Sequence, residues 1–180
     1  MKANLKKSIM ALKSVAKQEQ LIKKIANLIK EGGLTLVCGN GGSAGDSQHL
    51  VGELVCKFKK VRKPYPAIAL TTDTSVMTAI ANDFSYDDIF TRQVQAFKNA
   101  TTFIGISTSG TSINVLNAMK EAVKHGMIVV GLTGKNDKEM KKNGADYIIK
   151  VDSKETARIQ EGHIFVIHSI CELLENEGEE

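Results

Sequence analysis

A histidine and a glutamate one helical turn apart follow a glycine-rich turn early in the chain. His49 and Glu53 have i, i+4 spacing, so their side chains leave the same face of a helix. Residues 34–42 predict a short apolar strand and a turn, after which the helix begins near Ser43. Free N–H groups and the positive dipole end make such a helix N-terminus attractive to an anion. The pattern indicates proton chemistry on a phosphorylated substrate; a hydrogen-bonded pair without chemistry is the alternative.

A second chemical signal is the run of hydroxyl side chains at residues 107–112, STSGTS. It lies between a predicted strand and a predicted helix, where O–H and N–H donors together surround a phosphate well. As an alternative, Ser109 or Ser112 caps the helix, but capping needs only one of the five hydroxyls. We therefore predict that this run binds phosphate.

The glycine turn also matches a loose dinucleotide fingerprint, G-x-G-x-x-A, beginning at Gly39. The acidic residue that should follow about 20 positions later is missing, because that region is rich in lysine. NAD is therefore not expected. A tight turn without a ligand is a further alternative, although Asn40 and Ser43 add donors that a plain turn does not need.

Further candidate donors lie near the C-terminus, where Gln160, His163 and His168 belong to one predicted helix. A lone histidine on such a helix is more often structural than a ligand. If this helix faces the first one, four side chains supply N and O donors to a tetrahedral metal: His49, Glu53, Gln160 and His168. The spacing of these residues does not show whether the two helices face each other.

Composition is that of one ordinary globular domain, with 180 residues, 42% hydrophobic and 24% charged residues, and a net charge of +4. Three cysteines without C-x-x-C spacing indicate neither a disulfide framework nor a cysteine zinc site. No apolar run approaches the roughly 20 residues of a membrane span, and lysines interrupt the apolar N-terminus. The basic cluster at 57–63 reads as a solvated loop, since little aromatic character is interleaved. We expect a cytoplasmic protein that binds neither membrane nor nucleic acid.

The N-terminal residues 1–31 predict a long amphipathic helix, with a possible break near Gln18 and an end at Gly32 and Gly33. Its apolar surface exceeds what one sheet face readily covers. We interpret it as an oligomerisation helix; packing on its own domain is the alternative.

An α/β core is predicted for residues 34–175. Short apolar strands alternate with helices at 34–38, 67–70, 103–106, 128–132 and 147–151. This order predicts a five-stranded parallel sheet with helices on both faces, a flavodoxin-like sandwich. Ligands of such sheets bind beyond the carboxyl ends of the strands, where the polar loops converge. The acidic end at 175–180 is expected to fray.

Several of these segments together resemble one enzyme family. The segments are CGNGGSAGDSQH, AIALTTD, the Asn82-Asp83 pair, ISTSGTS, LTGK and ARIQE…VIH. In order and approximate spacing, from about Gly33 to Cys171, they resemble the phosphoheptose isomerases, small proteins with one SIS domain, here 1–180. The resemblance implies interconversion of sedoheptulose 7-phosphate and D-glycero-D-manno-heptose 7-phosphate through a cis-enediol. This is a step toward bacterial heptose-containing polymers such as lipopolysaccharide.

The resemblance also implies roles for individual residues. Glu53 and His168 match the catalytic acid–base pair. The zinc ligands of the family match His49, Glu53, Gln160 and His168. The phosphate-binding residues match Ser107, Thr108, Ser109 and Ser112. Sugar-binding residues correspond to Asn40, Gly41, Gly42, Ser43, Glu53, Asn82, Asp83 and Gln160. The family is homotetrameric with active sites at subunit boundaries, which would explain the N-terminal helix.

Two positions depart from the usual family pattern. Ala81 stands where glycine is common, and Cys56-Lys57-Phe58 replaces a small residue followed by arginine and an aromatic residue. Neither change touches the acid–base pair. The main rival is a non-catalytic SIS protein that binds phosphosugars or associates with the bacterial replication initiator. That branch lacks the carboxylate at 53 and the histidine at 168. A second rival is an isomerase of another sugar phosphate, such as a hexose or pentose.

Overall fold

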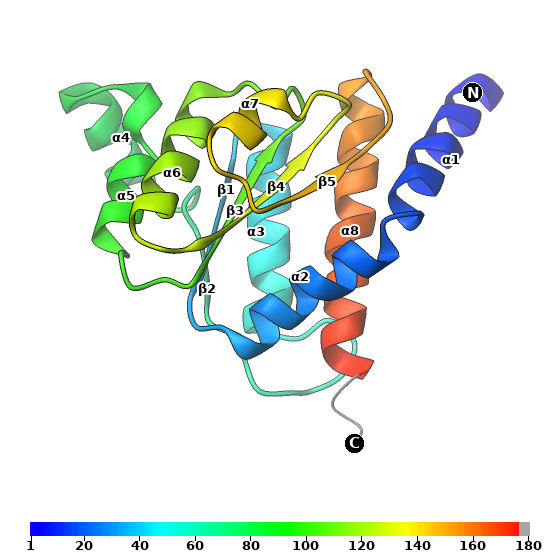
Figure 1. The fold of residues 1–180 in the computed structure, drawn as a ribbon, viewed down its shortest axis with the longest axis horizontal. Helices are drawn as coiled ribbons and strands as arrows, with labels where there is room; N and C mark the ends of the chain where they lie inside the picture. Colours follow the sequence, from blue (N-terminus) through cyan, green and yellow to red (C-terminus); the bar gives the residue numbers. More distant parts are fainter. Residues whose placement is uncertain (177–180) are drawn as a thin grey trace.

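The computed structural model describes residues 1–176 and shows a parallel sheet between two layers of helices (Figure 1). Its strand order is β2-β1-β3-β4-β5. The strands are β1 (Thr35–Gly39), β2 (Ala67–Ala69), β3 (Thr102–Ser107), β4 (Ile128–Thr133) and β5 (Tyr147–Lys150). Every residue of β1 and β3 is buried, as expected for strands covered on both faces. The predicted five-stranded α/β sandwich is confirmed.

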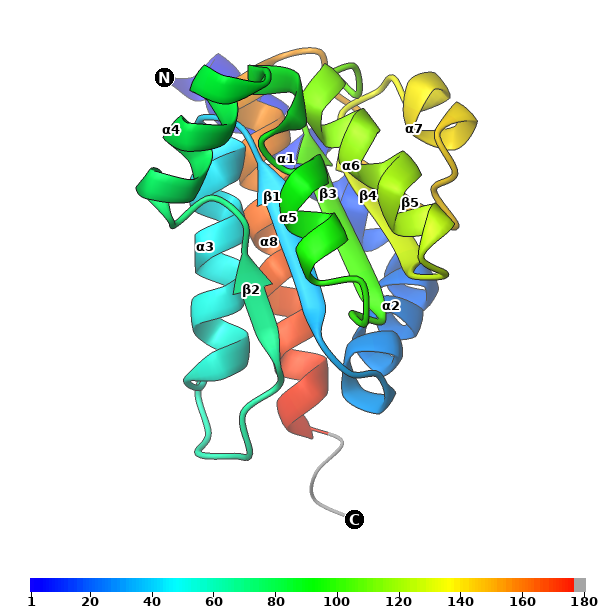
Figure 2. The same cartoon turned by 90° about the vertical axis from the view of Figure 1, so that its left-hand side faces the viewer.

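Alternating strand residues build two separate cores. In β1, Leu36 and Cys38 face one cluster, whereas Val37 faces the other. The layer on the Val37 side holds α1 (Lys2–Ala16), α2 (Glu19–Glu31), α3 (Gly42–Val55) and α8 (Thr156–Asn176). The opposite layer holds α4 (Thr74–Asp83), a 3-10 turn η1 (Tyr86–Asp88), α5 (Thr91–Ala96), α6 (Ile113–Lys124) and α7 (Lys138–Lys142). Figure 2 shows α3 and α8 behind the sheet, with α5 and α6 in front.

The predicted N-terminal helix breaks at the expected place. Gln18 stands between α1 and α2, and its side-chain amide donates to the Lys150 carbonyl and accepts from the Lys150 N–H at 2.7 and 3.1 Å. The apolar face of α2 packs into the core of its own chain, which is the alternative weighed above. By contrast, Leu5 and Met10 of α1 are 60% and 69% exposed. An oligomerisation role therefore stays a prediction that concerns α1.

Two details correct the sequence reading. Ile89, Val94 and Phe97 predict a helix over 89–97, and α5 lies within it at Thr91–Ala96, but the 3-10 turn η1 before it was not expected. Fraying from residue 175 is wrong for Glu175, which is helical and 6% exposed. The rest of the expected frayed end, 177–180, lies outside the described residues. None of the helices within 1–176 has the length and apolar character needed to cross a bilayer.

Candidate active site

The glycine turn opens α3 at the carboxyl end of β1. Gly41 has φ +55°, which favours glycine, and the Ser43 N–H donates to the Asn40 carbonyl at 2.9 Å. A Cβ at Gly42 would lie 2.0 Å from Nε2 of Gln160. Glycine at position 42 thus admits the Gln160 amide of α8 directly against the backbone, which brings Gln160 to the turn.

The Asn40 side chain is held by two partners that the sequence did not single out. It exchanges two hydrogen bonds with the Asn114 amide at 2.8 and 2.9 Å, and Tyr86 Oη donates to Asn40 Oδ1 at 3.1 Å. Asn114 is 3% exposed in the first turn of α6. An asparagine just beyond the hydroxyl run is a weak sequence signal, since its meaning depends on a partner 74 residues away.

The serine hydroxyls of the run at 107–112 converge. Ser107 Oγ lies 2.8 Å from Ser112 Oγ and 3.3 Å from Ser109 Oγ. Ser112 is the N-cap residue of α6, yet its side chain makes no capping hydrogen bond. Gly110 has φ +71°, and a Cβ there would lie 2.1 Å from the Asn136 carbonyl oxygen. The loop is thus shaped by glycine to gather hydroxyls at a helix N-terminus, where an anion is favoured.

A hollow of about 370 Å³ adjoins this loop. Its lining residues are Thr108, Ser109, Lys135, Asn136, Ser153, Lys154 and Ile159. Two lysines thus stand beside the hydroxyls, although Lys135 Nζ pairs with Asp152 at 2.8 Å. Hydroxyl donors and nearby cations suit the recognition of a phosphate.

The acidic and imidazole groups meet where α3 packs on α8. His49 Nε2 lies 3.2 Å from His168 Nε2 and 3.3 Å from Glu53 Oε1. The two imidazole rings are 5.0 Å apart in an edge-on arrangement. The side chains of His49 and Glu53 are 35% and 25% exposed, so solvent reaches this group. The structure therefore brings together three of the four predicted metal and catalytic residues.

Other predicted residues lie apart from this group. Within residues 1–176, Gln160 makes no hydrogen bond to it, and no three His, Cys, Asp or Glu side chains are arranged to hold a metal ion. Asn82 donates to Asp83 at 2.8 Å, and both are exposed at the end of α4 without a bond to the other candidates. Glu53 follows Gly42 by 11 residues, or about 16 Å of helix. The carboxylate and the glycine turn thus occupy opposite ends of α3.

A family model described as a SIS domain matches residues 3–134. The chain belongs to the SIS domain family. The phosphoheptose isomerase of Clostridium acetobutylicum is 46% identical over 183 residues, covering 97% of this chain and 93% of that protein. The phosphoheptose isomerase of Aneurinibacillus thermoaerophilus is 47% identical over 174 residues, covering 96% and 87%.

Solved structures agree with these relatives. A phosphoheptose isomerase from Neisseria gonorrhoeae superposes with a TM-score of 0.86 at 37% identity, covering 97% of this chain and 96% of that one. One from Francisella tularensis gives 0.84 at 33% identity, with the same coverage. The SIS domain protein described here therefore falls among the phosphoheptose isomerases and is a sugar-phosphate isomerase by class. The prediction of an enzyme is confirmed.

One buried acid of the SIS domain went unnoticed in the sequence. Asp46 in α3 is 7% exposed, and its Oδ2 has no hydrogen-bond partner among the described residues. Burial raises the pKa of Asp46 to about 6, against a smaller lowering by the neighbouring His49 charge. From the sequence, an aspartate in a glycine- and serine-rich helix start is expected to be exposed. Its burial becomes evident only from the packing of α3 in the fold.

Replacing Asp46 by asparagine is expected to stabilise the protein at neutral pH but not in acid. The raised pKa means that the folded state binds the Asp46 proton more tightly than the unfolded state. The free energy of unfolding therefore falls as pH rises from about 4 to about 6. Asp46→Asn removes this loss, about 2–3 kcal/mol above pH 7. Urea unfolding at pH 4 and pH 8 measures the free energy of unfolding of both proteins. Asp87→Asn, at an exposed position, is the control. An equal gain in stability at both pH values would contradict a raised pKa of Asp46.

Proposed function

We propose that this SIS domain protein interconverts sedoheptulose 7-phosphate and D-glycero-D-manno-heptose 7-phosphate. The observation that carries the proposal is the approach of Glu53 and His168 to the same atom, His49 Nε2, at 3.3 and 3.2 Å. An aldose–ketose exchange through an enediol needs a base for the carbon-bound proton and a group that moves protons between oxygens, and a neighbouring carboxylate and imidazole can fill these two roles. The kinship with named phosphoheptose isomerases supports the choice of a heptose over a smaller sugar.

In the proposed mechanism Glu53 is the base that moves a proton between carbons. It takes the proton from the carbon beside the carbonyl, which gives a cis-enediol, and returns it to the neighbouring carbon. His168 transfers the proton between O1 and O2, because an imidazole exchanges protons readily near neutral pH. The edge contact between the two imidazoles holds His168 beside His49, which in turn lies 3.3 Å from Glu53 Oε1. Each side chain thus acts on a different atom of the same sugar.

The substrate phosphate is proposed to bind the converging hydroxyls of Ser107, Ser109 and Ser112. Replacing both Ser109 and Ser112 by alanine is expected to weaken sugar-phosphate binding by about 1–3 kcal/mol, through lost charge-assisted hydrogen bonds. Calorimetric titration measures the affinity. Ser8→Ala, a hydroxyl change on α1, should leave it unchanged. Unaltered affinity in the double variant would move the phosphate to another site.

Zinc is part of the proposal, with His49, Glu53, Gln160 and His168 as its ligands. The two short separations at His49 Nε2, 3.2 and 3.3 Å, support it, since tetrahedral zinc bonds of about 2.0–2.2 Å place neighbouring ligands about 3.3–3.6 Å apart. A closed site also needs Gln160 and Glu53 to turn toward the imidazoles. When bound, zinc would polarise the substrate carbonyl. Metal content of the purified protein, measured in wild type and His49→Ala, tests the ligand set.

A homotetramer with active sites at subunit boundaries is proposed as the working form. Exposed Leu5 and Met10 on α1 support association, and so does the length of α3 that separates Glu53 from the glycine turn. A neighbouring copy would then complete each site. Sedimentation equilibrium measures the mass directly, and a monomer at micromolar concentration would contradict this part. A cytoplasmic location and a role in heptose polymer synthesis stay predictions.

The deciding experiment is to incubate the protein with sedoheptulose 7-phosphate and to follow the aldose by NMR, with and without chelator. Fructose 6-phosphate and ribulose 5-phosphate serve as competing substrates. Formation of the heptose aldose supports the proposal. Turnover of the hexose or pentose alone would favour the rival isomerase, and no turnover of any sugar phosphate would contradict the reaction itself.

A further inference from the structure

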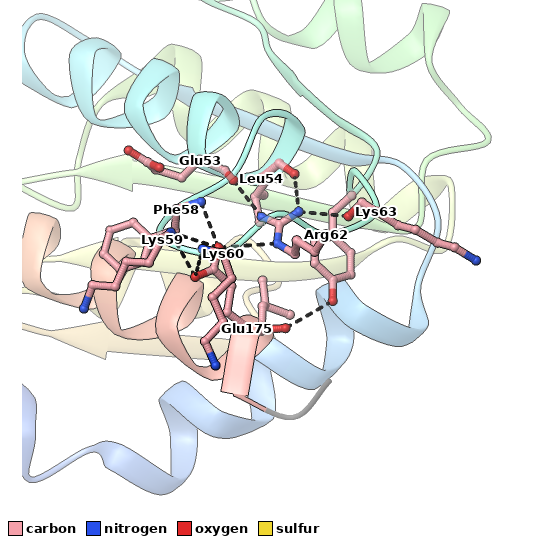
Figure 3. Close-up of polar contacts among 10 residues, drawn as sticks. Glu53, Leu54, Phe58, Lys59, Lys60, Arg62, Lys63 and Glu175 are labelled. Carbon is pink, nitrogen blue, oxygen red and sulfur yellow. Dashed lines mark hydrogen bonds and ion pairs between the residues drawn. The ribbon is translucent and has the colours of Figure 1, made fainter. Parts of the chain in front are cut away.

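A buried carboxylate at the end of α8 organises the loop that follows α3. Glu175 Oε1 and Oε2 accept hydrogen bonds from three consecutive backbone N–H groups, those of Phe58, Lys59 and Lys60, at 2.9–3.0 Å (Figure 3). Burial raises the pKa of Glu175, but these hydrogen bonds and the Arg62 charge outweigh it, so the pKa lies below its usual value. Glu175 is therefore a charged anchor at neutral pH.

Arg62 of the same loop closes the C-terminal end of α3. Its guanidinium donates to the carbonyl oxygens of Glu53 at 2.7 Å and Leu54 at 2.9 Å, while Nε lies 3.9 Å from Glu175 Oε1. Figure 3 shows Arg62 between α3 and Glu175. The last carbonyls of a helix have no partner within the helix, and a cation there also satisfies the dipole. Arg62 thus holds the helical turn that carries Glu53.

The anchored loop also brings an aromatic ring to the second catalytic candidate. Phe58 lies with its ring centroid 5.3 Å from that of His168, tilted by 33°. Glu175 follows His168 by seven residues, or two helical turns, so both lie on nearly the same face of α8. The hydrogen bond from Phe58 N–H to Glu175 therefore holds the backbone from which the Phe58 ring reaches His168.

We propose that Arg62 and Glu175 are positioning residues that set Glu53 and His168 from outside the active site. We call them the loop clamp. Arg62 fixes the backbone at Glu53, and Glu175 fixes Phe58 against the His168 imidazole. Neither side chain touches the proposed reacting atoms. The expected effect of the loop clamp on catalysis rests on the proposed function. A displacement near 1 Å at such groups costs about 100-fold in rate, so kcat should respond more than KM.

Three variants and one reference test the loop clamp. Glu175→Gln removes the charge, and Arg62→Lys keeps a charge but loses the fork that binds two carbonyls. Glu172→Gln is the matched control, because Glu172 lies on the same helix end and pairs with the Lys59 ammonium at the exposed surface. Phe58→Leu serves as reference, since it removes the ring and leaves the clamp. Thermal unfolding of each variant establishes that it folds.

The first readout is the NMR signal of the His168 ring protons, which requires no substrate. Glu175→Gln is expected to move these signals in the direction seen in Phe58→Leu, whereas Glu172→Gln leaves them in place. Arg62→Lys is expected to move them in the same direction, because Arg62 Nε also lies 3.9 Å from Glu175 Oε1 and its loss loosens the Glu175 carboxylate. The second readout is kcat, expected to fall about 10- to 100-fold in both clamp variants with KM little changed. Wild-type ring signals, or wild-type kcat, in a folded clamp variant would overturn the proposal. If Glu175→Gln does not fold, Arg62→Lys carries both readouts. If the wild-type protein shows no turnover, only the proposed function is contradicted. The NMR signals of the His168 ring protons then test the loop clamp by themselves.

Discussion

Replacing Glu53 by glutamine is expected to lower kcat by about 10²–10⁴-fold while sugar-phosphate binding persists. Glutamine has nearly the same shape, so the contact at 3.3 Å to His49 Nε2 and the packing of α3 on α8 are retained. The amide cannot take a proton from carbon. Binding persists because the proposed phosphate anchor lies on the 107–112 loop, between the end of β3 and the start of α6, and does not include Glu53. NMR of turnover and calorimetry of binding measure the two effects separately.

Glu172→Gln provides the control for Glu53, since it makes the same chemical change on the exposed surface of α8. It should keep wild-type kcat. Near-normal turnover in Glu53→Gln would remove Glu53 from the mechanism. A loss confined to affinity would instead make Glu53 a binding residue.

Replacing His168 by asparagine is expected to lower kcat by about 10²–10³-fold, with a distinctive isotope pattern. Asparagine can still donate a hydrogen bond, but it cannot carry a proton between O1 and O2. Glu53 remains able to remove the carbon-bound proton. In D₂O we therefore expect deuterium to enter the substrate faster than aldose appears. In Glu53→Gln, by contrast, both exchange and product formation should be lost.

The control for His168 is His125→Asn. His125 Nε2 lies 3.2 Å from Glu121 Oε1 on α6, so it forms the same kind of pair away from the site. Its replacement should leave both exchange and turnover unchanged. Equal loss of exchange and turnover in His168→Asn would contradict a separate oxygen-to-oxygen role for His168.

Local sequence information was sufficient for the elements of the fold. Apolar runs bounded by glycine and polar residues predicted all five strands within one or two residues, because a strand buried on both faces leaves this pattern. The possible helix break near Gln18 is also where the structure places it. The 3-10 turn η1 was missed, since 3-10 turns carry no hydrophobic period of their own.

In the candidate site, too, the sequence predicted the local features and missed the contacts between distant residues. The i, i+4 relation of His49 and Glu53 and the hydroxyl run are local features, and the structure shows the contacts they predict between near neighbours. Other features depend on residues far apart in sequence. The Asn40–Asn114 pair and the loop clamp are contacts between such residues, and Asp46 is buried by the packing of the whole fold. No period or spacing marks such partners.

The sequence by itself therefore determined the α/β order and located the glycine turn, the hydroxyl run and the His49–Glu53 pair, because each depends on neighbours within a few residues. Only the tertiary structure decided that α8 presents His168 to His49 and that Glu175 holds Phe58 beside it. The physical reason is that packing of α3 against α8 chooses which faces meet, and that choice depends on the whole core beneath them.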